Sequence, residues 1–478
     1  MGTRATATRD IGSRRELFVD SFLIEKLNGA RLKLQEPRPG GVAIRYDEPW
    51  ERGPVGSCSF YTTVIKDGDI YRMYYRCDMT CIGYAESEDG INWRKPTLGL
   101  VEVDGSTANN AILPRRGQIS AFIDGRPGVP AAERYKANSP AEGGLAGYVS
   151  ADGVRWRKLR DEVIVPRELV NHFDSQNVMF WSEVEERYVL YARHMEGGRR
   201  ATARATSEDF VDWTGPTLMA YSDTGTTTPS EHLYTNQTHP YFRAPHIYIS
   251  LPGRILFADV RQIPREDDIA AARRRVITDE VRRFRETEVD PRGGGLGDVA
   301  DGVLLTSRAG TTMYDFTFRE SFVRPGIGLS NWTTRNNYPA CGVVQTGPTE
   351  MSLYVQRHYA QRTAYLERMT LRLDGFASLN APYDGGGMTT RPLTFAGDRL
   401  EVNYSTSAAG SIRVELQDAD GSALPGYGLD ECRELVGDDI ERDVAWESGS
   451  SVGGLAGRPV RLRVAMRDAD MYSFRFRR

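Results

Sequence analysis

A short pattern of serine, aspartate and tryptophan recurs along the chain and constrains its fold more than any other feature. It reads SEDGINW at 87–93, SADGVRW at 150–156 and SEDFVDW at 207–213, and weaker copies start at Ser307 and Leu371. Successive copies start 57 to 64 residues apart, except for one interval of 100 residues that contains an insertion. A unit of this length holds four short strands, which is the size of a β-propeller blade.

The units share an internal order. A mostly apolar strand comes first, as in FYTTVIKDG (60–68), and a tyrosine-rich strand follows, as in RYVLYAR (187–193). The Ser-x-Asp-Gly strand is third and ends in a tight turn, and the strand with the tryptophan is fourth and outermost. We expect each tryptophan to pack between blades. Five such units predict an all-β fold, with a five-bladed β-propeller over residues 1–384.

Two further segments differ from the repeat. After residue 384, stretches such as SIRVELQDADG (411–421) alternate with period two, which predicts a C-terminal β-sandwich over 385–478 with a supporting role. An insertion near 259–297 is rich in charged residues and poor in apolar ones. It is typical of a surface helix, which either decorates the propeller or acts as a lid over its site.

Composition excludes several classes of protein. Hydrophobic residues make up 40% and charged residues 26%, and the net charge of −4 gives no basic surplus for nucleic acid. The sequence has no run of 18 apolar residues, so it predicts no membrane span. The N-terminus lacks the apolar core of a signal peptide, and we therefore expect a cytoplasmic protein. The five cysteines are an odd number without a zinc motif, which favours buried free thiols. The sequence leaves the oligomeric state open.

The innermost strands of a propeller line a central funnel, so we expect site residues at the starts of the first strands and in the loops before them. Asp174, Gln176 and Asn177 stand before a strand too apolar to face water, a costly placement unless it is used. The candidate catalytic carboxylates are Asp124, Asp174, Glu231, Glu320 and Glu350. The candidate substrate-binding residues are Gln176, Asn177, Tyr234, Asn236, His239, Arg335, Asn336 and Asn337.

These residue types suit a carbohydrate. Amides, tyrosines and arginines bind sugar hydroxyls, and glycoside cleavage needs two carboxyl groups across the scissile bond. Two of the candidates have a simpler interpretation as well: Asp124 as a turn-capping residue and Glu350 as a strand-end carboxylate.

The blade pattern, IKDGDIYRMYYR (65–76) followed by IGYAESEDGINW (82–93), resembles the N-terminal propeller of glycoside hydrolase family 32 and its relatives in families 43, 68 and 117. The C-terminal segment also fits family 32. A closer resemblance, over nearly the whole chain, is to a group of bacterial family-32-like proteins. It is carried by LFVDSFLIE, AERYKA, FDSQNVMFW, EHLYTN, RNNYPA and STSAAGSIRVELQDADG.

The resemblance implies a hydrolase of furanosides or pyranosides with three acidic residues in the first three blades. The chain departs from that pattern, because GSCSFY (56–61) has no carboxylate where the family has its nucleophile motif. Asp124 is the nearest match to the family's second acid, and Asp174 occupies the region of the third. The residues that remain to supply a first-blade acid from a neighbouring loop are Asp20, Asp47 and Glu51.

Three hypotheses follow. The first is a glycoside hydrolase, or a related transglycosylase, that acts from the chain end of a furanoside or related oligosaccharide. Asp174 and Glu231 would be the acid/base or nucleophile pair and Asp124 would tune it, with Glu320 and Glu350 in reserve.

The second hypothesis is a non-catalytic carbohydrate-binding propeller. The third is a lyase that uses Tyr234 and His239 as acid and base on a uronic acid. None of the three needs a cofactor. No ligand motif points to a metal, and a structural calcium ion in the central channel is the one alternative left open.

Overall fold

The computed structural model describes residues 8–78, 80–114, 118–170, 173–256, 279–293, 299–333 and 335–478. Nearly all regular structure in these ranges is β-strand, which confirms the all-β prediction, and the only described α-helix is α2 (Asp279–Glu288). The chain divides into two compact units. Unit 1 comprises Met1–Glu36 and Leu371–Arg478, and unit 2 is Pro37–Thr370.

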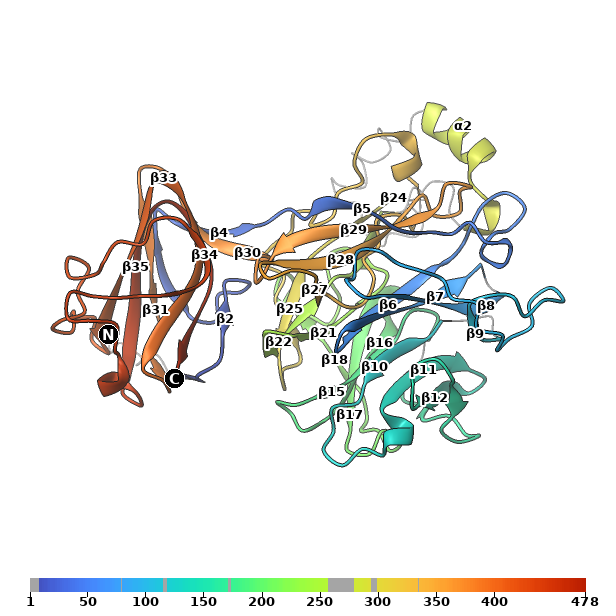
Figure 1. Ribbon diagram of the computed structural model, residues 1–478, viewed down its shortest axis with the longest axis horizontal. Helices are drawn as coiled ribbons and strands as arrows, with labels where there is room; N and C mark the ends of the chain where they lie inside the picture. Colours follow the sequence, from blue (N-terminus) through green and yellow to red (C-terminus); the bar gives the residue numbers. More distant parts are fainter. Residues whose placement is uncertain are drawn as a thin grey trace. The chain divides into compact units, whose positions relative to one another are not determined.

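Unit 2 begins with three antiparallel sheets that follow one another along the chain, each built on four strands in chain order (Figure 1). The first contains β6 (Phe60–Asp67), β7 (Ile70–Cys77), β8 (Cys81–Ser87) and β9 (Ala111–Leu113). The second contains β10 (Ser120–Ile123), β11 (Tyr135–Ala141), β12 (Gly144–Ser150) and β13 (Arg157–Lys158), and β14 (Val165–Pro166) also pairs with β12. The third contains β15 (Val178–Ser182), β16 (Arg187–Glu196), β17 (Arg199–Ser207) and β18 (Thr217–Leu218).

The fourth region of unit 2 is more broken. Its strands are β19 (Ala220–Tyr221) with β26 (Met313–Tyr314); β20 (His232–Leu233) with β23 (Gly253–Leu256) and β24 (Val299–Gly302); and β21 (His239–Tyr241) with β22 (Ala244–Ser250) and β25 (Leu305–Arg308). The last sheet contains β27 (Val344–Gln345), β28 (Glu350–Arg357), β29 (Tyr365–Arg372) and β5 (Arg38–Arg45). Its outer strand therefore comes from near the N-terminus.

The first strands of these sheets contact one another in a circuit. β6 contacts β10, β10 contacts β15, β15 contacts β21, and β27 contacts β6. Between β21 and β27, the backbone N–H of Val343 donates to Nε2 of His239 at 3.1 Å. Thr63 and Cys341 form a parallel bridge between β6 and the segment before β27. The starts of these strands therefore lie together.

The repeat takes the same local structure in each clear copy. In the copy at 150–156, Ser150 Oγ accepts the N–H of Gly153 at 2.9 Å, and Asp152 Oδ1 accepts the N–H of Val154 at 2.9 Å. Trp156 donates from its indole to the carbonyl of Gly153 and packs edge-on against Tyr74 of the preceding sheet. The expected packing of this tryptophan between sheets is confirmed, while the fourth strand, β13, starts only after it.

A second contact recurs between neighbouring sheets. A tyrosine hydroxyl on a second strand donates to a carboxylate at or just after the first strand of the preceding sheet. The pairs are Tyr135 with Asp67, Tyr188 with Asp124, and Tyr248 with Glu185. Each carboxylate also has a basic partner, and these are Arg134, Lys136 and Arg204, respectively. Buried polar atoms are thereby satisfied at every one of these junctions.

Unit 1 pairs the two ends of the chain. Its strands are β1 (Arg9–Gly12), β2 (Glu16–Leu17), β3 (Ile24–Asn28), β4 (Arg31–Leu34), β30 (Ala377–Ala381), β31 (Gly386–Thr390), β32 (Leu393–Phe395), β33 (Arg399–Asp418), β34 (Asp438–Asp443) and β35 (Val460–Arg477). The long strands β33 and β35 pair antiparallel, and the pairing is interrupted between Thr406 and Ser411. A single hydrophobic core around Trp446 lies beneath these strands.

This division differs from the predicted boundary between residues 384 and 385. β1 pairs with β32, β2 with β35, β3 with β31 and β4 with β30, so residues before 37 share a sheet with the C-terminal segment. The weak repeat copy at Leu371 is likewise no blade turn, because it connects β29 to β30 of unit 1.

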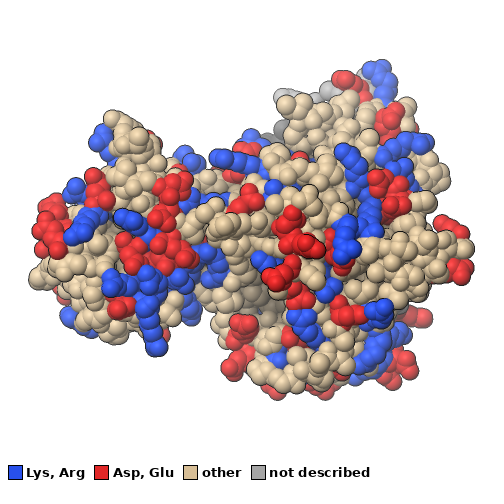
Figure 2. All heavy atoms as spheres, viewed as in Figure 1, with Lys and Arg blue, Asp and Glu red and all other residues tan. Residues whose placement is uncertain are grey.

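The described surface has mixed charge. Figure 2 shows acidic and basic side chains interspersed over the visible face of each unit. All five cysteines are free and buried, as predicted. Among the described helices, none has the length and apolar character needed to cross a membrane.

Candidate ligand-binding site

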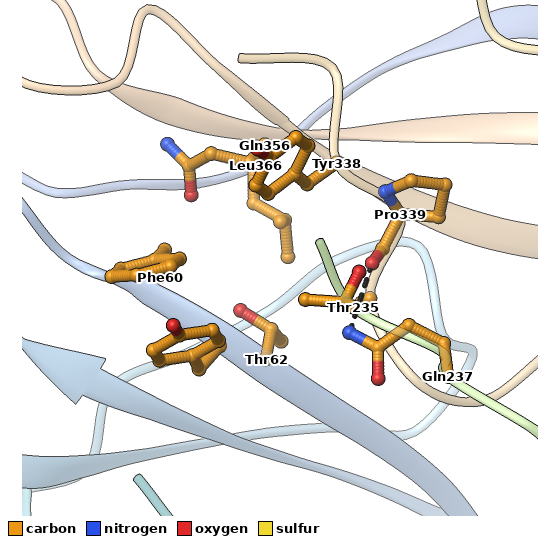
Figure 3. Close-up of a pocket in the computed structure, with 10 residues that line it drawn as sticks. Phe60, Thr62, Thr235, Gln237, Tyr338, Pro339, Gln356 and Leu366 are labelled. Carbon is orange, nitrogen blue, oxygen red and sulfur yellow. Dashed lines mark hydrogen bonds between the residues drawn. The ribbon is translucent and has the colours of Figure 1, made fainter. Parts of the chain in front are cut away.

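A pocket lies in unit 2 where the first strands begin. The space between its walls, open solvent included, is about 250 Å³. Figure 3 shows Phe60 and Thr62 facing Gln356 and Leu366 across this space, with Gln237 and Pro339 beside them. The complete lining is Phe60, Tyr61, Thr62, Thr235, Gln237, Tyr338, Pro339, Ala340, Gln356 and Leu366. The sequence predicted site residues at this end of the first strands.

Two buried glutamines hold the base of the site. Gln176 donates to Thr63 Oγ1 at 2.7 Å, and Gln237 donates to Oε1 of Gln176 at 2.8 Å and to the carbonyl of Pro339 at 3.2 Å. These bonds join segments from four of the sheets. Gln237 has a φ of 51°, a left-handed conformation that is costly for a residue other than glycine. The glutamine network therefore fixes where the first strands meet.

Three tyrosines form a stacked row beside the pocket. The Tyr61 and Tyr234 rings are nearly parallel with centroids 6.5 Å apart, and Tyr234 stacks on Tyr338 with centroids 5.4 Å apart. The hydroxyl of Tyr61 donates to that of Tyr234 at 3.1 Å. Burial, followed by the neighbouring Tyr234, raises the pKa of Tyr61 well above its ordinary value, so its hydroxyl stays protonated at neutral pH.

Four arginines surround this row; we call them the arginine cluster, and they are Arg76, Arg193, Arg200 and Arg335. The guanidinium carbons of Arg193 and Arg200 each lie 5.3 Å from the centroid of the Tyr234 ring, and that of Arg335 lies 5.5 Å from it. The guanidinium of Arg76 lies 5.1 Å from the Tyr61 centroid. Such distances allow cation–π attraction, which is strongest where water is excluded.

Arg335 of the arginine cluster was among the predicted binding residues, but Arg76, Arg193 and Arg200 were missed, although the sequence holds a signal for the first two. The second strands share a pattern: YRMYYR ends in Arg76, and YVLYAR ends in Arg193. In the last sheet Gln356 stands at the same place, two residues after Tyr354, and it lines the pocket. Aligning the second strands, rather than the loops before the first strands, would have found these residues.

Two of the predicted carboxylates lie near the cluster. The Asp174 side chain is 81% exposed and forms an ion pair with buried Arg193 at 3.2 Å. Glu231 Oε1 accepts from Arg319 at 2.8 Å, while its Oε2 is buried without a hydrogen-bond partner in the described structure. Glu231 precedes His232, whose Nδ1 lies 3.3 Å from Nη1 of Arg200. Asp174 therefore pairs with an arginine that contacts Tyr234. The Glu231 carboxylate pairs instead with Arg319 and, at 3.8 Å, with Arg254, and it is linked to the cluster only through its chain neighbour His232.

The other predicted carboxylates lie elsewhere. Asp124 follows β10 and is held by Lys136 at 2.8 Å and Tyr188 at 2.6 Å, as one member of the repeated contact between sheets. Glu350 starts β28 and pairs with Arg368 at 2.8 Å. It stands six residues before Gln356, or about 20 Å along an extended strand. Glu320 is exposed. The geometry gives these three no support as catalytic residues.

The side chains of most predicted binding residues form hydrogen bonds within the protein, chiefly to backbone carbonyl groups. Asn236 donates to the Tyr191 carbonyl, Asn337 to the Ala300 carbonyl, and Asn177 to the Phe173 carbonyl. Asn336 donates to the Ser330 carbonyl, and Gln176 belongs to the glutamine network. Of the predicted binding residues, only two take part in the tyrosine row: Tyr234 belongs to it, and Arg335 packs against it.

His239 is also fixed structurally. Its Nδ1 lies 2.8 Å from the carbonyl of Gln237, and its Nε2 accepts the N–H of Val343. Burial lowers the pKa of His239 below its ordinary value, which matches a neutral ring with one donor and one acceptor nitrogen. With both nitrogens engaged, His239 has no free position for an acid or a base.

The residues considered for a first-blade acid do not meet the pocket lining. Glu51 is fully buried between Tyr75 and Lys95, at 2.6 Å from each, and burial raises the pKa of its carboxyl group. Asp47 pairs with the same Lys95 at 3.2 Å. Asp20 belongs to unit 1, where it accepts the N–H of Phe22. No group of three or more metal-binding side chains is present in the described ranges.

The described part of the insertion packs toward the site. Val289 and Phe284 of α2 and its C-terminal extension belong to the same hydrophobic cluster as Tyr61, Tyr234 and Tyr338. The insertion is thus more than a solvated decoration where the structure describes it. The rest of the predicted insertion, residues 259–278 and 294–297, lies outside the described residues.

No family model matches the sequence, and no curated protein matches it significantly. Among solved structures, one similar to this chain is an N-acetylgalactosamine deacetylase from F. plautii in complex with blood group B trisaccharide, at 11% identity and a TM-score of 0.45, covering 72% of this chain and 96% of that one.

Glycoside hydrolases are also among the solved neighbours. A thermostable family-43 glycoside hydrolase matches at 11% identity and a TM-score of 0.37, over 69% of this chain and 96% of that one. An exo-β-1,3-galactanase from Phanerochaete chrysosporium matches at 7% identity and a TM-score of 0.37, over 92% and 99%. At these identities and TM-scores the likeness assigns the chain to no family.

Proposed function

We propose that unit 2 is a five-bladed β-propeller, that unit 1 contains a β-sandwich, and that the protein is a glycoside hydrolase. The first three sheets of unit 2 follow the three clear repeat copies, three smaller sheets and the sheet of β27 to β29 come after them, and the first strands contact one another in a circuit. β5 joins the last sheet from the N-terminal side, which is how a propeller ring closes without a free edge.

One observation carries the enzymatic proposal: beside a pocket lined by stacked tyrosines, Asp174 pairs with Arg193 of the arginine cluster, and Glu231 directly precedes His232, which contacts Arg200 of the same cluster. Flat aromatic rings offer an apolar face on which a sugar ring packs, and carboxylates supply the acid and base that glycoside cleavage needs. The proposed reaction is exo action on a furanoside or related oligosaccharide, the kind of substrate that the resemblance of the blade pattern implies.

We assign the two carboxylates different roles. Asp174 is exposed and held by Arg193, and we assign it the role of the group that attacks the anomeric carbon or activates a water molecule. Glu231 has a buried Oε2 that lacks a hydrogen-bond partner in the described structure, and we assign it the role of the acid that assists the leaving group.

The test is a screen of the purified protein against oligosaccharides and aryl glycosides, followed by Asp174→Asn and Glu231→Gln. General acid–base catalysis contributes about 10²- to 10⁴-fold, so each variant should lose at least about 100-fold in kcat. Glu208→Gln, an exposed residue in a repeat turn, is the matched control and should keep full activity. Full turnover in both site variants would refute this pair.

A second candidate function is supported by the tyrosine pair. In a uronate lyase, a deprotonated tyrosine takes the proton next to a carboxylate that arginines neutralise, and a protonated group gives a proton to the leaving oxygen. The Tyr61 and Tyr234 hydroxyls lie 3.1 Å apart beside arginines, and Tyr234 would be the base with protonated Tyr61 as the acid. Because His239 is fully engaged, Tyr61 would replace it as the partner of Tyr234. The absorbance of an unsaturated product distinguishes the two reactions, since hydrolysis does not form one.

A further inference from the structure

We propose that the sugar bound at this site carries an anionic group, a carboxylate or a sulfate ester, and that the arginine cluster binds it. This inference rests on the proposed function only in taking the ligand to be a carbohydrate. It names the class of substrate that the hydrolase proposal leaves open, and it includes the uronate that the lyase alternative requires.

The first argument is charge. Arg76 and Arg193 are buried, and Arg335 is half-buried. In the described structure, Arg76 and Arg335 have no carboxylate partner within ion-pair distance, and the single such partner of Arg193 is Asp174, whose side chain is 81% exposed. Buried cations are normally paired, because an uncompensated charge away from water is costly. The cluster therefore has excess positive charge at the site.

The second argument is the arrangement of donors. Arg193 and Arg200 lie within 5.3 Å of the centroid of one ring, that of Tyr234, so their guanidinium carbons are separated by at most twice that distance. Burial, followed by repulsion from Arg193, lowers the pKa of Arg200. Like charges held together in this way favour an anion between them over a neutral group.

Unused donors point to the same place. Nε of Arg193 and Nε of Arg76 are buried and have no hydrogen-bond partner in the described ranges. A guanidinium that packs against an aromatic ring keeps its N–H edge available, and that edge matches the two oxygens of a carboxylate or sulfate. A neutral sugar that excluded water here would leave these donors and charges uncompensated.

The experiment measures binding separately from turnover. Asp174→Asn protein is titrated by calorimetry with oligogalacturonate, oligoglucuronate and sulfated galactan oligosaccharides, and with neutral galacto-, gluco- and xylo-oligosaccharides of the same length. We expect binding to one of the anionic series, weakened by added salt. Preference for uronate or sulfate series identifies the anionic group. Binding confined to the neutral series, or no binding to any anionic series, would overturn the inference.

Variants of the cluster locate the anion. Arg335→Gln and Arg193→Gln should weaken binding of the preferred anionic oligosaccharide about tenfold or more, because each removes charged hydrogen bonds. Arg193→Lys keeps the charge but not the planar fork, and should bind less tightly than wild type. Arg155→Gln, an exposed arginine of a repeat turn, is the control and should bind normally. Thermal melting verifies that each variant is folded.

The outcomes separate this inference from the proposed function. Anionic ligands that bind but are not cleaved by wild-type protein would support the inference and refute the hydrolase proposal. Turnover of neutral glycosides alone, with unchanged kinetics in the arginine variants, would retain the hydrolase and refute the inference. Equal affinity of wild type and both glutamine variants for an anionic oligosaccharide would place the anion elsewhere and overturn the assignment.

Discussion

Replacement of Asp124 by asparagine should destabilise the protein without removing an essential catalytic group. The Asp124 carboxylate is fully buried and lies 2.8 Å from Nζ of Lys136, whose side chain is only 2% exposed. It also accepts the Tyr188 hydroxyl at 2.6 Å. Asparagine removes the negative charge and leaves Lys136 buried, with Glu133 at 3.4 Å as its remaining ionic partner.

The magnitude follows from this geometry. Loss of one partner of a buried ion pair costs about 3–5 kcal/mol, and the surviving contact with Glu133 places Asp124→Asn toward the lower end. Unit 2 spans Pro37–Thr370, and an unfolding entropy of about 2.1 cal/mol/K per residue converts this loss into a fall in Tm of about 4–7 °C.

The assay combines thermal melting with turnover of the best substrate from the screen. Asp124→Asn should melt earlier and keep kcat within about threefold at a temperature well below its Tm. The double variant Asp124→Asn/Lys136→Met should recover part of the loss, because it removes the unpaired charge as well. An unchanged Tm together with a loss of turnover of about 100-fold or more would show that Asp124 takes part in the chemistry instead.

Three further predictions concern the repeat turns and the rim of the site. Gly153→Ala should cost about 2–4 kcal/mol in the free energy of unfolding, because φ is +73° and the new Cβ would meet Tyr74 Oη at 2.8 Å. The control Gly128→Ala has a φ of +77° and no atom within 4 Å of the new Cβ, so it should cost only about 1 kcal/mol. Equal losses of the two variants in urea unfolding would refute the packing argument. Burial of Asp152 opposes ionisation, but N–H donors from its own turn outweigh burial and lower the pKa of Asp152 to about 2. The ionised carboxylate therefore stabilises the fold above pH ~4, and this contribution is lost as the pH falls toward 2. The stability difference between wild type and Asp152→Asn should shrink over that range, and a constant difference would contradict the prediction. Burial, followed by repulsion from Arg200, lowers the pKa of His232 to about 4. The wild-type protein should therefore lose stability relative to His232→Gln as the pH falls from ~6.5 to 4, measured by urea unfolding at each pH. Parallel pH profiles of the two proteins would disprove this prediction.

The repeat made the sheets of unit 2 predictable, since its turn uses local hydrogen bonds that any copy can form. The Ser150, Asp152 and Trp156 side chains all bond within seven residues of chain. What could not be read locally is pairing between distant segments. β5 completes the sheet of β29, and β1–β4 pair with strands more than 300 residues away, so neither the place of β5 nor the limits of unit 1 has a local sequence signal.

The candidate site was predictable in place but only partly in residues. Polar residues before the first strands were expected to face a ligand, and Gln176 and Gln237 stand there. The starts of five strands also lie close together at that position, and their backbone carbonyl groups need hydrogen-bond donors. The amide side chains supply these donors and so connect neighbouring sheets. The buried polar cost that suggested function at Gln176 is offset by protein hydrogen bonds rather than by a substrate.

The arginines show a different logic for the same repeat. In β16, the hydroxyl of Tyr188 links two sheets. A second tyrosine follows at Tyr191, and Arg193, two residues after it, reaches the site. The residue at this position is arginine in β7 and β16 and glutamine in β28, so a structural repeat supplies a recognition position whose side chain varies by sheet. Since the connectors use the polar residues before the first strands, we infer that Arg76 and Arg193 on the second strands, together with Arg200 and Arg335, supply the charge that selects the ligand.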